Sequence, residues 1–168
     1  MATTQRTCIW VPLASFGFSS GTWARSLVAD VEAWVRTAAD ATPIIFCTLP
    51  VPPEFPPHIP VEVNVASVDF FYEIATEAAE AAPSTVLRRK TPAAATIPAL
   101  VVETEAEAIT GDNTTGTAAG QYRLRITPTI PVRLLPDEQL QMEVTVNMGT
   151  NGVLRVYGAR INIEGGGS

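Results

Sequence analysis

The clearest pattern of apolar and polar positions lies in residues 140–163. In residues 140–148 every even position is apolar and every odd position between them is polar. This period of two is what a strand with one buried and one solvent-facing side requires. Residues 149–152 read Gly-Thr-Asn-Gly, and the Asn-Gly step tolerates the positive φ of a reversal. The pattern predicts a β-hairpin whose second strand covers 153–163, with an apolar face of Val153, Tyr157, Ala159, Ile161 and Ile163. Its phase breaks near Gly158, which indicates a bulge or a strand covered on both sides.

Residues 22–38 carry apolar side chains at helical spacing. These side chains belong to Trp23, Leu27, Val31, Trp34, Val35 and Ala38. Most charged residues lie off this stripe, and Thr22 is a suitable N-cap. We therefore expect one amphipathic helix over about 22–38. Its two tryptophans are interpreted as anchors, either in the core or at a subunit contact.

Six prolines fall within residues 50–60. Proline fixes φ and lacks an N–H group, so this segment is neither a helix nor an interior strand. We interpret it as an extended arm or a rigid crossover. The alternative is a Pro-rich segment that docks on an aromatic groove. As an arm, it offers four candidate subunit contacts, which are Pro52, Pro53, Pro56 and Pro57.

The other segments read as short strands separated by turn signals. Residues 61–65 and 68–74 alternate in two halves with a change of phase at 66–67, which predicts two strand halves with a bulge or a kink between them. A helix over 68–82 is the competing interpretation, because Ala and Glu favour helices. Seven or eight strands with one helix indicate a mainly β fold, an antiparallel β-sandwich or jelly roll.

The length and composition suit a folded chain whose surface is covered by neighbours. A chain of 168 residues is expected to form one β-rich domain over 1–168, with a flexible Gly-rich tail at 164–168. Hydrophobic residues make up 46%, which argues against global disorder. Charged residues make up only 17%, less than the usual quarter, so a free monomer is a poor fit.

The charge pattern excludes some partners. The net charge is −6, and residues 88–90 are the only basic run. Phosphate binding needs clustered positive charge, so we expect no direct binding of nucleic acid. We interpret the basic run as a solvated strand end or an inter-subunit ion pair. The sequence has no apolar run long enough to span a membrane, and the N-terminal patch at 8–14 is a poor signal peptide.

Reactive residues are few and lack the spacing of known sites. Cys8 and Cys47 form no zinc pattern and are expected to be buried free thiols, although a single bridge between them stays open. The only histidine, His58, has no nucleophile motif near it. Asp112 and Asn113 lack the repeating register of a helix-loop-helix calcium site. The sequence therefore predicts no catalytic residue, no cofactor and no metal, and we expect no enzyme.

The C-terminal part, about residues 120–163, carries one resemblance. It combines a Tyr-Arg-Leu-Arg-Ile strand after a polar Gly/Thr loop, a Leu-Pro-Asp-Glu-Gln-Leu turn and a closing hairpin that ends in Tyr-Gly-Ala-Arg-Ile-Asn-Ile. This order resembles small β-sandwich or jelly-roll proteins of virus particles, especially tailed or icosahedral phages. The resemblance implies a virion component that is not an enzyme. It carries over no functional residues, because it contains no diagnostic motif.

Two hypotheses follow from these patterns. The first is a structural self-assembling virion protein, such as a capsid, decoration or tail-associated subunit, assembled in the host cytoplasm and located in the virion. Its partners would be copies of itself and other virion proteins. The alternative is a carbohydrate-binding β-sandwich module. Its candidate stacking platforms are Trp10, Trp23, Trp34 and Tyr157.

Overall fold

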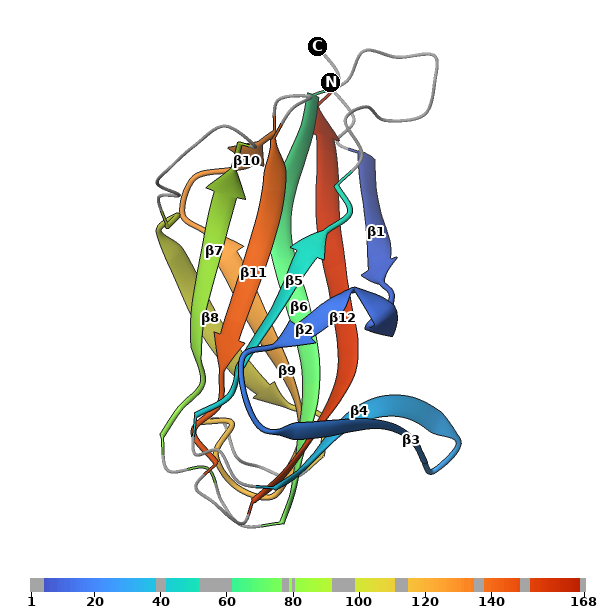
Figure 1. Cartoon of the computed structure of the whole chain (residues 1–168). Coiled ribbons are helices and arrows are strands. Elements are labelled where there is room, and N and C mark those ends of the chain that lie inside the picture. Colours follow the sequence, from blue (N-terminus) through green and yellow to red (C-terminus); the bar gives the residue numbers. More distant parts are fainter. Residues whose placement is uncertain are drawn as a thin grey trace.

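Two antiparallel sheets face each other in the computed structural model of this chain, and strands make up nearly all of its regular structure (Figure 1). The structure describes residues 5–38, 42–51, 62–76, 79, 81–91, 99–110, 115–134, 138–148 and 152–166. The described elements are one short 3-10 helix, η1 (Leu13–Ser15), and the strands β1 (Gln5–Val11), β2 (Phe16–Phe18), β3 (Thr22–Val28), β4 (Val31–Ala38), β5 (Ile44–Leu49), β6 (Glu62–Thr76), β7 (Ser84–Lys90), β8 (Val102–Ala108), β9 (Gly120–Pro128), β10 (Val132–Arg133), β11 (Gln139–Thr145) and β12 (Val153–Gly166). The mainly β, antiparallel prediction is confirmed.

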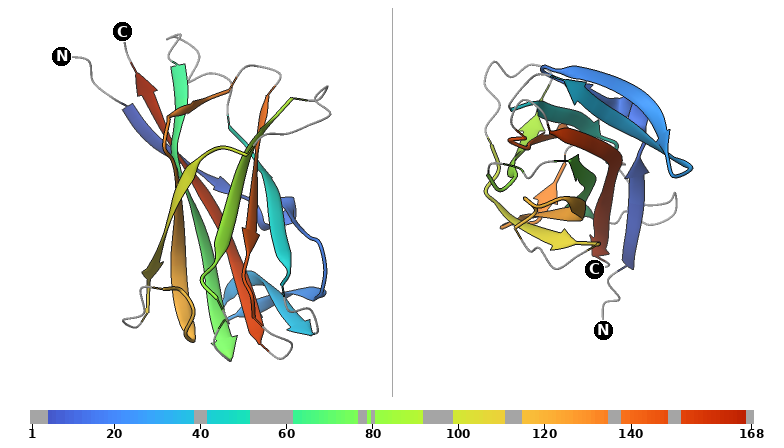
Figure 2. Two further views of the ribbon diagram at one scale, coloured as in Figure 1. Left: turned by 90° about the vertical axis from the view of Figure 1, so that its left-hand side faces the viewer. Right: turned by 90° about the horizontal axis from the view of Figure 1, so that it is seen from below.

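The larger sheet has eight strands and the smaller has four. The larger sheet runs in the order β3-β4-β12-β6-β9-β8, with β1 paired to β12 and β10 paired to β6. The smaller sheet runs β2-β5-β11-β7 (Figure 1). Two further views show the layers from the side and from below (Figure 2). Each sheet therefore has one inner and one outer face, as the alternation along the strands requires.

The core lies between the two inner faces. From the smaller sheet, Leu140, Met142 and Val144 of β11 are fully buried. From the larger sheet, β6 contributes Phe70 and Tyr72. The rings of Phe70 and Tyr72 are 5.8 Å apart, and Tyr72 continues to Tyr122 at 5.2 Å. Alternating side chains thus form one cluster between the layers, which supplies most of the driving force for folding.

Two predicted bulges are confirmed, and one of them changes which side chains face outward. In β6 the pairing with β12 shifts at Ala66, because Asn162 is opposite Ser67 while Ile163 is opposite Val65. In β12 the extra residue is Tyr157, because Val156 is opposite Tyr72 and Gly158 is opposite Phe71.

The bulge in β12 turns Tyr157 outward. The sequence pattern placed Tyr157 on the apolar face, which is wrong, because the inner face of this part is formed by Leu154, Val156 and Ala159. Gly158 has a φ of +139°, a conformation that favours glycine. At the same point, the neighbour on the outer edge of β12 changes from β4 to β1.

The predicted helix over 22–38 is wrong. This segment is a β-hairpin of β3 and β4, in which Trp23 is opposite Arg36 and Val28 is opposite Val31. β4 pairs in turn with residues 154–156 of β12. The unpaired backbone groups at that edge of β12 give β4 ladder partners that a helix could not use. Helical spacing misled the prediction because most of the β3 side chains are exposed and show no clear alternation.

A substitution in the turn of this hairpin distinguishes the hairpin from the predicted helix, because it is expected to change the free energy of unfolding in opposite directions in the two. Ala29 and Asp30 have φ values of +47° and +67°, so both central residues of the turn are left-handed. Replacing Ala29 with glycine relieves this strain, and we expect the free energy of unfolding to rise by about 0.5 kcal/mol. In a helix the same change would lower it by about 1 kcal/mol. Urea denaturation distinguishes the two.

The matched control is the same substitution within a strand of the same hairpin. Ala24 is exposed in β3 and has no positive φ. Ala24→Gly is therefore expected to lower the free energy of unfolding by about 0.5–1 kcal/mol. A loss of stability in both variants would contradict the hairpin turn.

Three other predictions concern residues 68–82, residues 164–168 and the Pro-rich arm. The competing helix over 68–82 is wrong for its first part, since β6 continues as a strand to Thr76. The predicted tail at 164–168 is wrong for residues 164–166, which pair with β6 as the end of β12. Residues 52–60 of the Pro-rich arm, which include Pro52, Pro53, Pro56, Pro57 and His58, lie outside the described residues.

Candidate functional site

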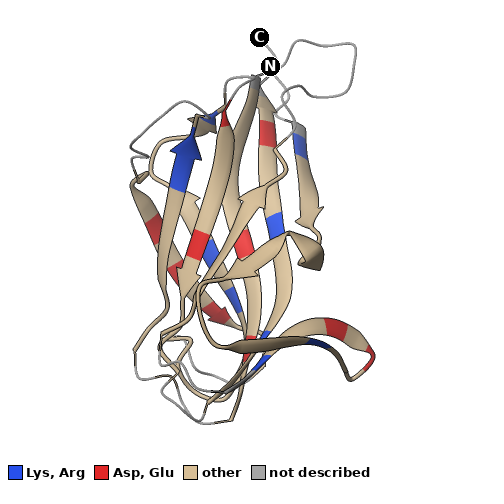
Figure 3. Cartoon of the chain, in the orientation of Figure 1, with Lys and Arg blue, Asp and Glu red and all other residues tan. Residues whose placement is uncertain are grey.

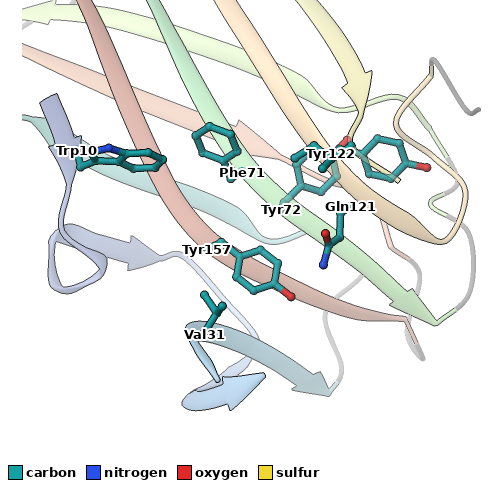
Figure 4. Close-up of a pocket in the computed structure, with 8 residues that line it drawn as sticks. Trp10, Val31, Phe71, Tyr72, Gln121, Tyr122 and Tyr157 are labelled. Carbon is teal, nitrogen blue, oxygen red and sulfur yellow. The ribbon is translucent and has the colours of Figure 1, made fainter. Parts of the chain in front are cut away.

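A cleft of about 340 Å³ opens on the outer face of the larger sheet. Its lining includes three aromatic side chains that face away from the core, Trp10 of β1, Phe71 of β6 and Tyr157 of β12 (Figure 4). Val31 at the tip of the β3–β4 hairpin and Gln121 of β9 also line it (Figure 4). The rest of the lining is Ile109 and the two core tyrosines, Tyr72 and Tyr122. We call this hollow the aromatic cleft. Segments far apart in the sequence meet in it, because β12 joins β1, β4 and β6.

One end of the aromatic cleft is a fixed stack of rings. Trp10 is 60% exposed, and its ring lies 5.4 Å from that of Phe71 in a stacked arrangement. The guanidinium of Arg160 lies 5.6 Å from the Trp10 ring centre and 5.8 Å from that of Phe71. A cation over an aromatic face is attracted by the electrons of the ring. The stack therefore holds a solvent-facing tryptophan in one orientation.

At the other end, the polar side chains that line the cleft are Tyr157 and Gln121, and both contact Glu73 beside it. Arg155 Nη1 donates to Glu73 Oε1 over 2.6 Å, the hydroxyl of Tyr157 donates to Glu73 Oε2, and Gln121 Nε2 lies 3.5 Å from the same oxygen. Partial burial raises the pKa of Tyr157, and the carboxylate of Glu73 adds to this rise. Tyr157 is therefore protonated at neutral pH and donates its hydrogen. The network presents donors and acceptors in fixed positions.

A second network on the same face surrounds Asp69. Its buried carboxylate accepts hydrogen bonds from Arg125 Nε at 2.9 Å, Arg160 Nη2 at 2.6 Å and Asn162 Nδ2 at 3.0 Å. Burial on its own raises the pKa of Asp69, but the hydrogen bonds from Arg125, Arg160 and Asn162 outweigh it and hold the pKa below its usual value. Arg160 belongs both to this network and to the Trp10 stack. The Asp69 network thus fixes the guanidinium that holds Trp10.

The predicted contact residues Trp23 and Trp34 do not enter the aromatic cleft. Trp23 stacks on Phe18 at 3.9 Å, and Trp34 meets the same ring edge-on at 5.3 Å. Their indole N–H groups donate to the carbonyls of Ser20 and Leu13. Both side chains are half-buried, and these contacts hold the β3–β4 hairpin against residues 13–20 of the same chain. Their role at a subunit contact stays a prediction.

The cysteines are free and belong to different sheets. Cys8 is exposed on β1, and Cys47 is buried on β5. The expectation of free thiols is confirmed, while the predicted burial of Cys8 is wrong. Burial raises the pKa of Cys47 to about 12, so this thiol is protonated and unreactive at neutral pH.

Sequence reasoning named Trp10 and Tyr157 but missed Phe71, Glu73 and Arg160. A signal for Phe71 was present, because it sits between Asp69 and Glu73 in the polar phase of a strand. An aromatic residue in the solvent-facing phase indicates a ring that stays partly exposed. The contribution of Arg160 could not be foreseen, since it depends on the register of β12 against β1 and β6.

The described residues hold no group of three or more histidine, cysteine, aspartate or glutamate side chains arranged to bind a metal ion. Nor do they include a helix of the length and apolarity that a membrane crossing needs.

Comparison of the sequence with protein-family models and with curated proteins finds no match. The class that the fold defines is an antiparallel β protein of two facing sheets. Its aromatic cleft has the chemistry of a binding site.

Proposed function

We propose that this protein is a structural, self-assembling subunit of a virion, with the role of a capsid, decoration or tail-associated component. The observation that carries the proposal is the order in which its strands pair. As a virion subunit, the protein acts in the virion after assembly in the host cytoplasm. Its partners are copies of itself and other virion proteins. The proposal includes no catalytic step.

Three of the four strand pairs of a jelly roll are present once the β3–β4 hairpin and the short strands β2 and β10 are set aside. Eight strands remain, and the first pairs with the last, β1 with β12. The second pairs with the seventh, β5 with β11, and the third with the sixth, β6 with β9. The middle two, β7 and β8, depart from this order, because the ladder partner of β8 is β9 in the larger sheet. β7 meets this part of the chain through an isolated bridge from Arg88 to Ala99, just before β8, and through a hydrogen bond between the hydroxyls of Thr85 and Thr104.

This nested order results from rolling up one long ribbon, and virus capsid domains use it. Lectin domains and cupins share it, so the fold supports the class of protein by analogy only. The low charge content and the resemblance in residues 120–163 favour the virion use among these. A rigid block of this kind serves assembly by keeping its contact surfaces at fixed angles.

The β3–β4 hairpin is the surface best suited to a subunit contact. It extends sideways from the two sheets (Figure 1), and among the described strands β3 pairs only with β4. Near its tip, Leu27 is 73% exposed. An unpaired edge with an exposed apolar side chain is a template for pairing with another chain. We propose that the hairpin contacts a neighbouring subunit.

The proposal predicts a multi-subunit particle that depends on this hairpin. We expect light scattering to show multi-subunit particles at micromolar concentration, and Leu27→Asp to shift the mass toward the monomer. A charge at a buried contact costs several kcal/mol unless it is paired, enough to dissociate weak contacts. Ile130→Asp is the control, because Ile130 is as exposed but lies in the turn after β9.

A wild-type chain that stays monomeric at these concentrations would contradict the proposal. Equal effects of the two substitutions would remove the hairpin as the contact. The gene neighbourhood tests the virion part separately, because adjacent terminase, portal or major capsid genes are expected. Neighbouring genes without any virion component would contradict that part.

A further inference from the structure

We infer that the aromatic cleft binds a neutral saccharide, with a sugar ring against Trp10 and its hydroxyl groups toward Tyr157 and Gln121. This inference does not rest on self-assembly, because it uses a different surface from the free edge of β3. It is carried by the joint presence of an exposed, fixed ring and a set of fixed polar groups in one hollow.

The first step of the argument is the exposure of Trp10. Trp10 is 60% exposed, so its ring offers a large apolar surface with a polar N–H to a ligand. It is also held in place, by the stack on Phe71 and by the Arg160 guanidinium. A ring fixed in its orientation loses little conformational entropy when a ligand covers it. The C–H faces of a sugar ring match such an apolar platform.

The second step is the polar end of the cleft. Tyr157, Gln121 and Arg155 all point their polar groups at Glu73, so these groups are oriented before any ligand arrives. Of these residues, Tyr157 and Gln121 line the cleft; a phenol hydroxyl donates and accepts, and an amide carries two donor hydrogens and an acceptor. Sugar hydroxyls both donate and accept, so they match a mixed set of this kind.

The third step is the charge, which argues for a neutral ligand. Glu73 is paired with Arg155, and Asp69 is paired with Arg125 and Arg160. Further along β9, Arg123 pairs with Glu107. Acidic and basic residues are interspersed over the chain (Figure 3). With its arginines engaged by carboxylates, this face offers no clustered positive charge to a phosphate or a nucleic acid.

The size of the cleft sets the extent of the ligand. Its volume of about 340 Å³ lies at the lower end of the range for small-molecule sites. We therefore expect it to hold one or two sugar units of a chain that continues into solvent. Val31 closes one side, so the position of the β3–β4 hairpin limits the length that fits.

The inference is tested by titrating the full chain with neutral oligosaccharides of glucose, mannose, galactose and xylose. Binding is followed by tryptophan fluorescence and by calorimetry, up to about 10 mM, because weak sites have Kd values near 1 mM. We expect at least one oligosaccharide to bind and to shift the emission. Trp10→Ala is expected to weaken binding at least tenfold, because the stacking platform is lost.

Two further variants separate stacking from folding. Trp10→Phe keeps a smaller ring and is expected to bind with intermediate affinity, while Ile130→Ala, an exposed apolar change outside the cleft, is expected to bind like the wild type. Far-UV circular dichroism checks that each variant is folded.

Three outcomes would overturn the inference. They are the absence of binding to every neutral oligosaccharide, binding that Trp10→Ala leaves unchanged, and preference for a sialylated or sulfated probe over all the neutral ones. If Trp10→Ala instead lowers the mass of the assembly without any saccharide binding, the cleft is a contact with a second copy. Loss of assembly by Leu27→Asp alone leaves the saccharide inference unaffected, so the two proposals fail separately.

Discussion

Replacing Phe70 with alanine is expected to lower the free energy of unfolding by about 4 kcal/mol. Phe70 is fully buried in β6 and lies between Phe16, at 6.2 Å, and Tyr72, at 5.8 Å. Its removal takes away apolar burial and leaves a cavity that rings from both sheets line. Because those rings are held by their own strands, the site is expected to collapse only partly. Urea denaturation followed by circular dichroism measures the change.

The next residue provides a matched control. Phe71 has the same side chain on the same strand but faces the aromatic cleft, where it is half-buried. Phe71→Ala is expected to lower the free energy of unfolding by about 1 kcal/mol, since less apolar surface is lost. Equal losses in the two variants would contradict the assignment of the inner and outer faces of β6.

Replacing Asp69 with alanine is expected to cost about 3 kcal/mol of stability at neutral pH. The carboxylate is fully buried and compensates two guanidinium groups, from Arg125 and Arg160. Removing one member of a buried ion pair leaves uncompensated charge, which costs about 3–5 kcal/mol. We take the lower end because both arginines are partly exposed, at 39% and 27% of their side chains.

The control for Asp69 is an ion pair on the same sheet that water reaches. Glu107 on β8 pairs with Arg123 on β9, and its side chain is 59% exposed. Glu107→Ala is expected to change the free energy of unfolding by less than about 1 kcal/mol, because solvent screens the pair. A cost at Asp69 as small as that at Glu107 would show that the Asp69 network adds no stability.

The same carboxylate makes stability depend on pH. The pKa of Asp69 is lower in the folded chain than in the unfolded chain, so the unfolded state takes up its proton first as the pH falls. Its contribution is complete above the unfolded pKa of about 3.9 and is lost as the pH falls through the folded value. The stability difference between the wild type and Asp69→Asn is therefore expected to be constant near neutral pH and to shrink below about pH 4. A difference that grows on acidification would contradict this assignment.

Local sequence rules served best where one face of a strand is buried and the other is wet. The alternation in residues 140–148 identified β11, and the phase changes near 66–67 and Gly158 identified two bulges. They failed for the β3–β4 hairpin, where most β3 side chains are exposed and the apolar spacing fits a helix equally well. There the decision came from β12, whose free edge pairs with β4.

The residues of the aromatic cleft were likewise only partly predictable from the sequence. The sequence contained an aromatic residue in the polar phase of β6 and a tyrosine at a bulge, and both are local features. Which residues meet across strands depends on register, and a shift by one position would send each side chain to the other face. By itself, the sequence determined that this protein is built from antiparallel strands with one wet and one dry side. Only the tertiary structure decided that Trp10, Phe71 and Tyr157 share one hollow, because β12 pairs with β1 and β6, which lie far from it in the chain.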